Sequence, residues 1–404
     1  MTPPSDGVRW RMLLWIALAE LGALSLWFSA TAVIPVLRTD WLDDAAKAWL
    51  SMSVTLGFVA GTAVSAVLTL ADWLGARRLF VVSSVVGAIA NVALVPLIDS
   101  FGAVVVCRFV TGLAMAGTYP PGMKLAASWF ARDRGLAVGT LVGALTFGGA
   151  LPHFVNFLGG LAWPVVIVTT SLAALAAAAI MGLLVRDGPH VQPRSPFDPG
   201  CLGALVRNRG VVLASLGYFG HMWELYAMWA WIGLYFIEAF TRAGVAAAPS
   251  LGSLVTAVVI GAGGVSCIVA GRIADRVGRT ATTMAAMVTS GASAAVIGLV
   301  FGAPAALIGV ALVWGFTIVA DSAQFSTAVS ELAPPEYIGT ALSLQTCVGF
   351  TLTLVSTRLV PVMAAEWGWA WAFAFLAPGP FLGTLAMWAL RRLPESAKLA
   401  HGRR

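Results

Sequence analysis

The sequence predicts an all-α protein that crosses a membrane twelve times. Three observations lead to this prediction: the apolar composition, the length of the apolar runs and the placement of the basic residues. Of the 404 residues, 59% are hydrophobic and 10% are charged, whereas a soluble protein carries about 25% charged residues. The composition excludes a soluble globule. It also excludes a disordered chain, because disordered chains are poor in apolar residues.

Twelve apolar runs are long enough to cross a bilayer as helices, which takes roughly 20 mostly apolar residues. Two longer runs are divided at Gly159 and Gly302, each followed within a few residues by a proline, because glycine and proline punctuate helices. The predicted spans are residues 12–37, 48–71, 79–98, 102–128, 135–157, 162–186, 210–240, 247–271, 280–301, 304–331, 338–363 and 368–390.

The basic residues indicate how these spans are oriented. With the N-terminus in the cytoplasm, 18 of the 24 Lys and Arg residues fall on the cytoplasmic side, three fall outside and three lie within spans. This distribution follows the positive-inside rule, so the net charge of +6 reflects topology and not nucleic-acid binding. Both ends are expected in the cytoplasm, and the chain is expected in the lipid bilayer of the cytoplasmic (inner) membrane.

A polar, proline-rich segment divides the chain nearly in half. Residues 187–209 contain four prolines, which is typical of a linker. The sequence therefore predicts an N-terminal six-helix bundle over 1–186, a cytoplasmic linker over 187–209, and a C-terminal six-helix bundle with a short basic tail over 210–404.

The two halves resemble each other at a shift of about 204 residues. Glu20 and Trp27 of the first span align with Glu224 and Trp231 of the seventh. Repeated six-span halves are typical of secondary transporters, whose solute site lies near the midplane between the repeats.

Two motifs make the pattern more specific. The loop from Gly271 to Arg279 reads Gly, three residues, Asp, a basic residue, one residue, Gly and a basic residue, and a degenerate copy follows the second span. Arg108, Gly112 and Pro120 form a second motif in the fourth span. With these motifs, the twelve spans and the linker, the chain resembles the major facilitator superfamily over essentially its full length. The resemblance implies two bundles that rock around a cavity lined by spans 1, 4, 7 and 10.

The resemblance also implies a conformational gating role for the loop residues, which would brace the cytoplasmic helix ends. Carboxylates near helix N-termini and cations near C-termini are favoured by the helix dipole; the alternative is a set of solvated loop charges. The gating candidates are Gly271, Asp275, Arg276, Gly278 and Arg279 in the second half, and Asp72, Gly75 and Arg77 in the first.

Ionisable residues inside a span are costly and are expected to face a cavity. Glu20 and Glu224 are the main candidates for proton coupling, because they occupy equivalent places in the two halves and each has a Trp two turns further on. His221 lies three residues before Glu224 on the same helix face, and Asp321 lies in the tenth span. For Glu20, a structural ion pair with an intramembrane arginine is the alternative.

The solute-cavity candidates combine cations with aromatic and amide groups. An arginine can hold a carboxylate with two parallel hydrogen bonds; alternatively, Arg108 pairs with a backbone carbonyl group or with Glu20. For the aromatic residues, packing is the alternative to a cavity role. The candidates are Arg108, Arg358, Trp27, Tyr119, Tyr226, Trp231 and Gln324.

The predicted function is secondary active transport of a small organic solute by alternating access, coupled to protons. The arginines favour an organic anion, and the fifth span lacks the Gly-Pro pair of the family's antiporters. The alternative is a proton-driven exporter of hydrophobic cations or drugs. No HExxH motif, catalytic triad or nucleotide-binding loop occurs, so an enzyme is not expected. No metal, cofactor or obligate protein partner is expected either, and the expected ligands are the solute and protons.

Overall fold

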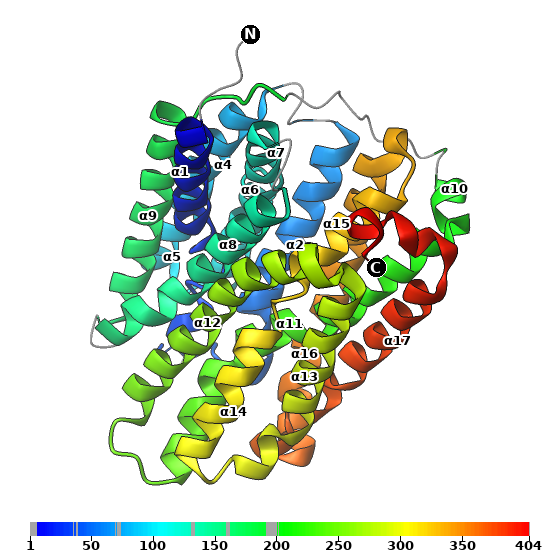
Figure 1. Cartoon of the computed structure of the whole chain (residues 1–404). Helices are drawn as coiled ribbons and strands as arrows, with labels where there is room; N and C mark the ends of the chain where they lie inside the picture. The colour runs from blue at the N-terminus through cyan, green and yellow to red at the C-terminus, as the bar shows by residue number, and fades with distance from the viewer. Residues whose placement is uncertain are drawn as a thin grey trace. The chain divides into compact units, whose positions relative to one another are not determined.

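The computed structural model describes residues 6–34, 36–37, 39–68, 70, 74–130, 134–158, 162–190, 200 and 202–403. These residues form helices, turns and loops, and no strand occurs among them. The chain divides into two compact units, Met1–Arg194 and Ser195–Arg404 (Figure 1). The boundary between the units lies within the predicted linker.

Unit 1 is built from helices that cover the first six predicted spans. In span 1, α1 ends at Leu24 and a short 3-10 turn follows at Thr31. The elements are α1 (Asp6–Leu24), η1 (Thr31–Val33), α2 (Asp44–Val67), α4 (Ala76–Val92), α5 (Leu94–Leu97), α6 (Phe101–Met115), α7 (Tyr119–Trp129), α8 (Arg134–Leu158) and α9 (Trp163–Leu183).

Unit 2 has a longer first span than predicted and a folded C-terminal tail. Its elements are α10 (Leu202–Arg207), α11 (Arg209–Arg242), α12 (Ala248–Val277), α13 (Arg279–Val296), η3 (Ile297–Val300), α14 (Pro304–Thr317), α15 (Ser322–Leu332), η4 (Pro335–Tyr337), α16 (Ile338–Trp367), η5 (Trp369–Trp371), η6 (Ala374–Leu376), α17 (Pro378–Arg392) and η7 (Pro394–Gly402).

Ten helical segments of the described residues are long and apolar enough to cross a membrane. The other two predicted spans fall on α1 and α11, which carry Glu20 and Glu224. Large apolar side chains lie on the outside of the units; Leu183 is 82% exposed and Leu299 is 71% exposed. Such surfaces are suited to lipid, where apolar side chains are favoured.

Three predicted spans are interrupted near their middle. Span 1 loses its helix after Leu24, span 4 between α6 and α7, and span 10 between α14 and α15. Pro120 and Pro121 open α7 in its first turn, where a missing N–H group does no harm. The breaks in spans 4 and 10 lie at equivalent places in the repeat, and Asp321 lies at the second of them, immediately before α15.

Two glycines at equivalent positions let helices approach backbone to backbone. A Cβ atom added at Gly112 of α6 would lie 1.8 Å from the carbonyl oxygen of Val54 in α2. A Cβ atom added at Gly315 of α14 would lie 2.2 Å from the carbonyl oxygen of Val259 in α12. Small residues that allow such close approach are typical of membrane helix interfaces.

Replacing Gly112 with alanine is expected to destabilise the protein by about 1–3 kcal/mol, because overpacking against backbone atoms forces the helices apart. Unfolding in detergent, followed by denaturant titration, measures the change. Gly102→Ala is the matched control, since Gly102 lies on the same helix and a Cβ atom there would meet nothing within 4 Å. Equal stability of the two variants would contradict the close packing of α2 and α6.

Candidate functional site

Glu20 is enclosed within unit 1. It is 0% exposed, and neither carboxylate oxygen has a hydrogen-bond partner among the described residues. On α7 the carboxyl group abuts Gly122, where an added Cβ atom would lie 1.8 Å from Oε1 of Glu20. Gly122 therefore makes the space that the carboxyl group occupies. Arg108, a described residue of the same unit, donates no hydrogen bond to it.

Arg108 holds the broken part of span 1 in place. The guanidinium group, 0% exposed, donates from Nη1 to the carbonyl oxygen of Leu26 at 2.9 Å and from Nη2 to that of Trp27. Nε donates to the carbonyl oxygen of Leu50 on α2 at 3.2 Å. Carbonyl groups that lose their helical partners must find other donors in a membrane. Arg108 supplies them, which corresponds to the backbone-carbonyl alternative considered for this residue.

A buried polar network extends from this arginine to α4 and α9. Ser29 accepts from Nη1 of Arg108 at 3.3 Å and donates to Oδ1 of Asn91 at 2.6 Å. Nδ2 of Asn91 donates to the hydroxyl groups of Thr170 at 3.2 Å and Ser171 at 3.0 Å. The network fixes the segment after α1 against three other helices. Asn91 was not predicted, although a single Asn in an apolar span is a signal that could have identified it.

Glu224 in unit 2 has a different environment from Glu20. It is 1% exposed, and each oxygen accepts one hydrogen bond from a neutral donor. Nε1 of Trp314 on α14 donates to Oε1 at 2.7 Å, and the hydroxyl group of Ser290 on α13 donates to Oε2 at 2.9 Å. The two equivalent acids of the repeat therefore differ: one is bonded twice and the other has no partner among the described residues.

His221 and Asp321 lie together in the same unit. Nδ1 of His221 is 2.9 Å from Oδ1 of Asp321, and both side chains are almost fully buried. Asp321 lies at the break in span 10, so the break brings its carboxyl group to α11. The imidazole ring also lies against Phe325, with ring centroids 5.6 Å apart.

The aromatic candidates are mostly packed inside their own units. Nε1 of Trp231 donates to the carbonyl oxygen of Thr357 at 2.9 Å, and Tyr226 packs on Phe350 with ring centroids 5.0 Å apart. Trp27 packs on Phe58, also at 5.0 Å. Tyr119 is half-buried. The sequence left a solute cavity and packing open for these side chains, and the structure gives the first three close contacts within a unit.

Two predicted polar cavity residues also have definite places. Arg358 is exposed on α16. Oε1 of Gln324, on α15, accepts from Nη1 of Arg279 at 2.9 Å, so its carboxamide oxygen is engaged with the loop motif.

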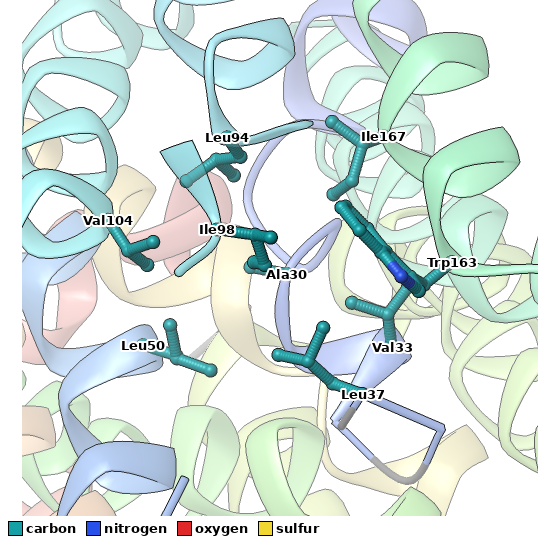
Figure 2. A pocket seen from close by; sticks show the side chains of 9 residues that line it. All are labelled: Ala30, Val33, Leu37, Leu50, Leu94, Ile98, Val104, Trp163 and Ile167. Atoms are coloured by element: carbon teal, nitrogen blue, oxygen red, sulfur yellow. The ribbon is translucent and has the colours of Figure 1, made fainter. Parts of the chain in front are cut away.

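A small apolar cavity lies beside the outer part of span 1 in unit 1 (Figure 2). Its lining side chains are apolar, apart from the indole nitrogen of Trp163. Such a lining offers almost no hydrogen bond to a polar solute. The lining residues are Ala30, Val33, Leu37, Leu50, Leu94, Ile98, Val104, Trp163 and Ile167.

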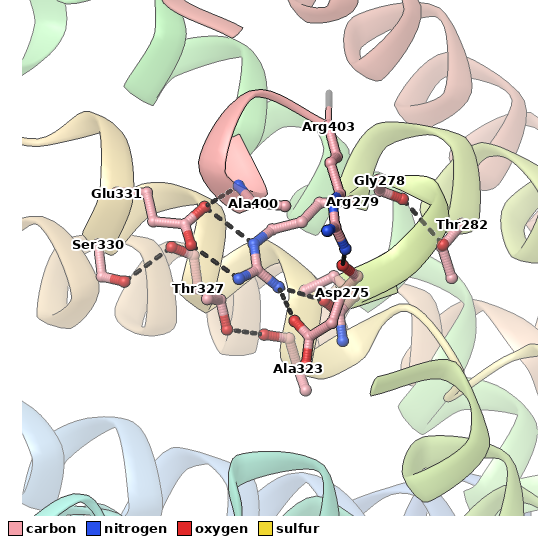
Figure 3. A network of polar contacts seen from close by, with 11 residues as sticks. Asp275, Gly278, Arg279, Thr282, Ala323, Thr327, Ser330, Glu331, Ala400 and Arg403 are labelled. Carbon is pink, nitrogen blue, oxygen red and sulfur yellow. Dashed lines mark hydrogen bonds and ion pairs between the residues drawn. The ribbon is translucent and has the colours of Figure 1, made fainter. Parts of the chain in front are cut away.

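The loop motif of unit 2 centres on Arg279 (Figure 3). Its guanidinium group is 6% exposed and forms two parallel bonds to Glu331 on α15, from Nε at 2.8 Å and from Nη2 at 2.7 Å. Oδ1 of Asp275 lies 3.6 Å from Nη1. Glu331 also accepts from the backbone N–H of Ala400 at 3.2 Å. The network thus joins the start of α13 to α15 and to the C-terminal tail.

The other loop candidates divide between the two halves. Gly271 is buried and Arg276 is exposed. Gly75 and Gly278, 203 residues apart, both adopt positive φ, +80° and +111°, which favours glycine. Arg77 donates to the carbonyl oxygen of Val185 at 3.1 Å. Asp72 lies outside the described residues.

Removing the guanidinium group in Arg279→Gln is expected to destabilise unit 2 by about 1–3 kcal/mol, because bonds to charged groups are the stronger ones. A double-mutant cycle with Glu331→Gln, read by denaturant unfolding, isolates the pair. Arg276→Gln is the matched control from the same motif and is expected to change stability by less than about 0.5 kcal/mol. A coupling energy near zero would show that the loop charges are merely solvated.

Comparisons with known proteins agree on one family. A family model of the Major Facilitator Superfamily matches residues 16–357 and 214–404. The solved structure of the nucleoside transporter NupG (D323A mutant) has a TM-score of 0.72 at 14% identity, covering 94% of this chain and 99% of that chain. The proton:xylose symporter XylE, bound to 6-bromo-6-deoxy-D-glucose, has a TM-score of 0.71 at 15% identity, covering 94% and 95%.

A curated relative matches over a shorter stretch. The MFS-type transporter hasB of Aspergillus fumigatus (strain CBS 144.89 / FGSC A1163 / CEA10) is 32% identical over 123 residues, which is 29% of this chain. The match spans about a quarter, 26%, of that relative's length. The family model covers most of the chain and the two solved structures share its all-α fold. The chain therefore belongs to the Major Facilitator Superfamily, as a multi-pass membrane transporter and not an enzyme.

Proposed function

We propose that this transporter couples the movement of a small organic solute to protons, in the cytoplasmic membrane and by alternating access. Glu20 in unit 1 and Glu224 in unit 2 bind the protons. The loop residues around Arg279 hold one conformational state.

The observation that supports proton coupling best is the environment of Glu20. An ionised carboxylate with no partner is very costly in an apolar interior, and such a group takes up a proton instead. Glu20 is fully buried, and both of its oxygens lack a partner among the described residues. It therefore holds a proton in this conformation. A conformation that opens span 1 to water would let it release that proton, which is the requirement for coupling.

The contacts of the two arginines bear on the charge of the solute. The sequence favoured an organic anion because Arg108 and Arg358 are cations within spans. The guanidinium group of Arg108 donates to backbone carbonyl groups and to Ser29. The carboxylate of a solute would have to displace those hydrogen bonds. Arg358, exposed on α16, is then the remaining anion contact. The geometry supports an uncharged or cationic solute better than an organic anion.

Exchange of a proton for a cationic solute is the second candidate function. The carboxyl group of Glu20 has no partner among the described residues, so it can be occupied either by a proton or by a cationic group of the solute. This arrangement would produce antiport of organic cations, the alternative considered from the sequence.

Purified protein in proteoliposomes with an imposed pH gradient tests both candidates. The probes are benzoate as an anion, uridine as an uncharged solute and ethidium as a cation, with a protonophore to collapse the gradient. Gradient-dependent movement of uridine or ethidium is expected. Transport that ignores the pH gradient would contradict proton coupling. Transport of benzoate that disappears in Arg358→Gln would instead support an organic anion as the solute.

A further inference from the structure

Glu224 shares a single hydroxyl hydrogen with a backbone carbonyl group. Ser290 on α13 lies 2.9 Å from Oε2 of Glu224 and 3.2 Å from the carbonyl oxygen of Met287, through the same Oγ atom. A serine has one hydrogen to donate and two lone pairs that accept. Ser290 can therefore donate to only one of these two oxygens at a time.

The other oxygen of Glu224 has a partner that cannot change its role. Nε1 of Trp314 lies 2.7 Å from Oε1, and an indole nitrogen donates only. Among the described contacts of Oε1 there is no acceptor for a proton on that oxygen. When Glu224 is protonated, the proton must therefore sit on Oε2, facing Ser290.

These two facts define two complete hydrogen-bond arrangements. With Glu224 ionised, Trp314 and Ser290 each donate to one oxygen. With Glu224 protonated, Oε2 donates to Oγ of Ser290, and Ser290 turns its hydrogen to the carbonyl oxygen of Met287. In either arrangement each polar hydrogen of Glu224, Ser290 and the Trp314 indole has an acceptor, although Glu224 and Ser290 are at most 2% exposed.

We propose that Ser290 is a positioning residue that completes the hydrogen bonding of Glu224 both when it is ionised and when it carries a proton on Oε2 in the closed site; the proton itself enters from water and leaves to water when the site opens. The inference rests on the proposed proton coupling and specifies the atom and the hydroxyl rotation that it uses. Glu20 has no such partner among the described residues, so only the acid of unit 2 is equipped to exist in both states within its unit.

The other charged groups near Glu224 are few. Asp321 lies at the junction of α14 and α15, and His221 on α11 contacts Asp321. On α13 and α14 the polar contacts of the carboxyl group are Ser290 and Trp314. Across the described parts of α12, α16 and α17, no residue forms an ion pair with it. The hydroxyl group is therefore the switchable contact of this carboxyl.

Infrared difference spectroscopy of the purified full-length protein between acid and neutral pH tests the proposal without a solute. Glu224→Gln identifies the carboxylic acid band of Glu224 by its loss. In Ser290→Ala the ionised form loses a charge-assisted bond and the neutral form loses an ordinary one. The pH midpoint of the band is therefore expected to rise by about 0.5–1 unit, with the carbonyl stretch displaced because the acid O–H has lost its acceptor.

Two further variants separate a switch from general damage to the fold. Ser290→Thr keeps the hydroxyl group and is expected to retain the wild-type midpoint and band position. Ser293→Ala is the matched control, since Ser293 is on the same helix and donates to the carbonyl oxygen of Thr289 instead. The spectra are compared only between variants that remain monodisperse. Trp314→Phe removes the hydrogen bond to Oε1 and is a second variant that alters the hydrogen bonding of the same carboxyl group.

The outcomes distinguish the switch from the proposed function. A band of Glu224 that titrates identically in wild type and Ser290→Ala would overturn the switch while leaving proton coupling in place. If Glu224→Gln removes no band and also leaves gradient-driven transport intact, Glu224 is not a proton site and both ideas fail for unit 2. A midpoint shift in Ser290→Ala that Ser290→Thr restores would establish the role of the hydroxyl group.

Discussion

Replacing Arg108 with methionine is expected to destabilise the protein by about 3–5 kcal/mol. The guanidinium group satisfies the carbonyl oxygens of Leu26, Trp27 and Leu50 at once. Each hydrogen bond to a charged group contributes about 1.5–3 kcal/mol; the costs do not add fully, because the carbonyl oxygen of Leu26 keeps the hydroxyl group of Ser29 as a donor and the broken segment can relax. Methionine keeps much of the volume, so the loss reports the hydrogen bonds and not a cavity.

Unfolding in detergent, followed by a denaturant titration, measures this effect. Arg358→Met is the matched control, because it also removes an arginine from a predicted span but from an exposed position on α16. A change below about 0.5 kcal/mol is expected for the control. If Arg108→Met is as stable as Arg358→Met, the hydrogen bonds from Arg108 to span 1 do not contribute to the free energy of unfolding. Arg108 would then again be available for a solute anion.

The sequence contained enough to predict the architecture. Spans are identified by hydropathy and basic loops because lipid imposes those features on every membrane helix. The repeat identified Glu20 and Glu224 as equivalent, and the loop motif identified Arg279. Each of these features is local in the chain, which is why periodicity and spacing are sufficient to detect it.

The breaks in the helices and the partners of the acids could not be predicted in the same way. Hydropathy does not report where a backbone stops forming helical hydrogen bonds, so the segment after Leu24 read as a continuous span. Ser290 is one of several Ser and Thr residues on α13, and only its contact with Glu224 distinguishes it. Glu331 lies 52 residues from its partner Arg279. These contacts depend on the fold and not on the local pattern.

Glu20→Gln is expected to abolish pH-driven accumulation of the transported solute, reducing it by at least about 10-fold, while leaving the protein folded. General acid–base groups contribute factors of about 10²–10⁴ to reactions that need proton transfer, and a group that must carry the proton has no substitute. Glutamine has the same shape as the neutral acid, so the fit beside Gly122 is retained. Proteoliposome transport with and without a pH gradient measures the loss of coupling.

The matched control is Glu238→Gln, which removes an acid from the outer end of α11 where it pairs with Arg242 at 2.8 Å. Its transport is expected to stay within about twofold of the unmodified protein, since exposed ion pairs contribute little. Accumulation that is unchanged in Glu20→Gln would contradict the role of Glu20, and the coupling proton would then belong to unit 2 alone.

A second-site test connects this effect to the geometry of the site. Gly122→Ala places a methyl group where Oε1 of Glu20 lies and is expected to displace the carboxyl group and weaken coupling. Glu20→Asp shortens the side chain by one methylene and should restore part of the coupling in the double variant, because the acid then fits beside the methyl group. Rescue by Glu20→Asp, but not by Glu20→Gln, would require both the space at Gly122 and a group that can ionise. A clash alone would be relieved by any shorter side chain, so Glu20→Ala in the same background separates steric relief from proton transfer.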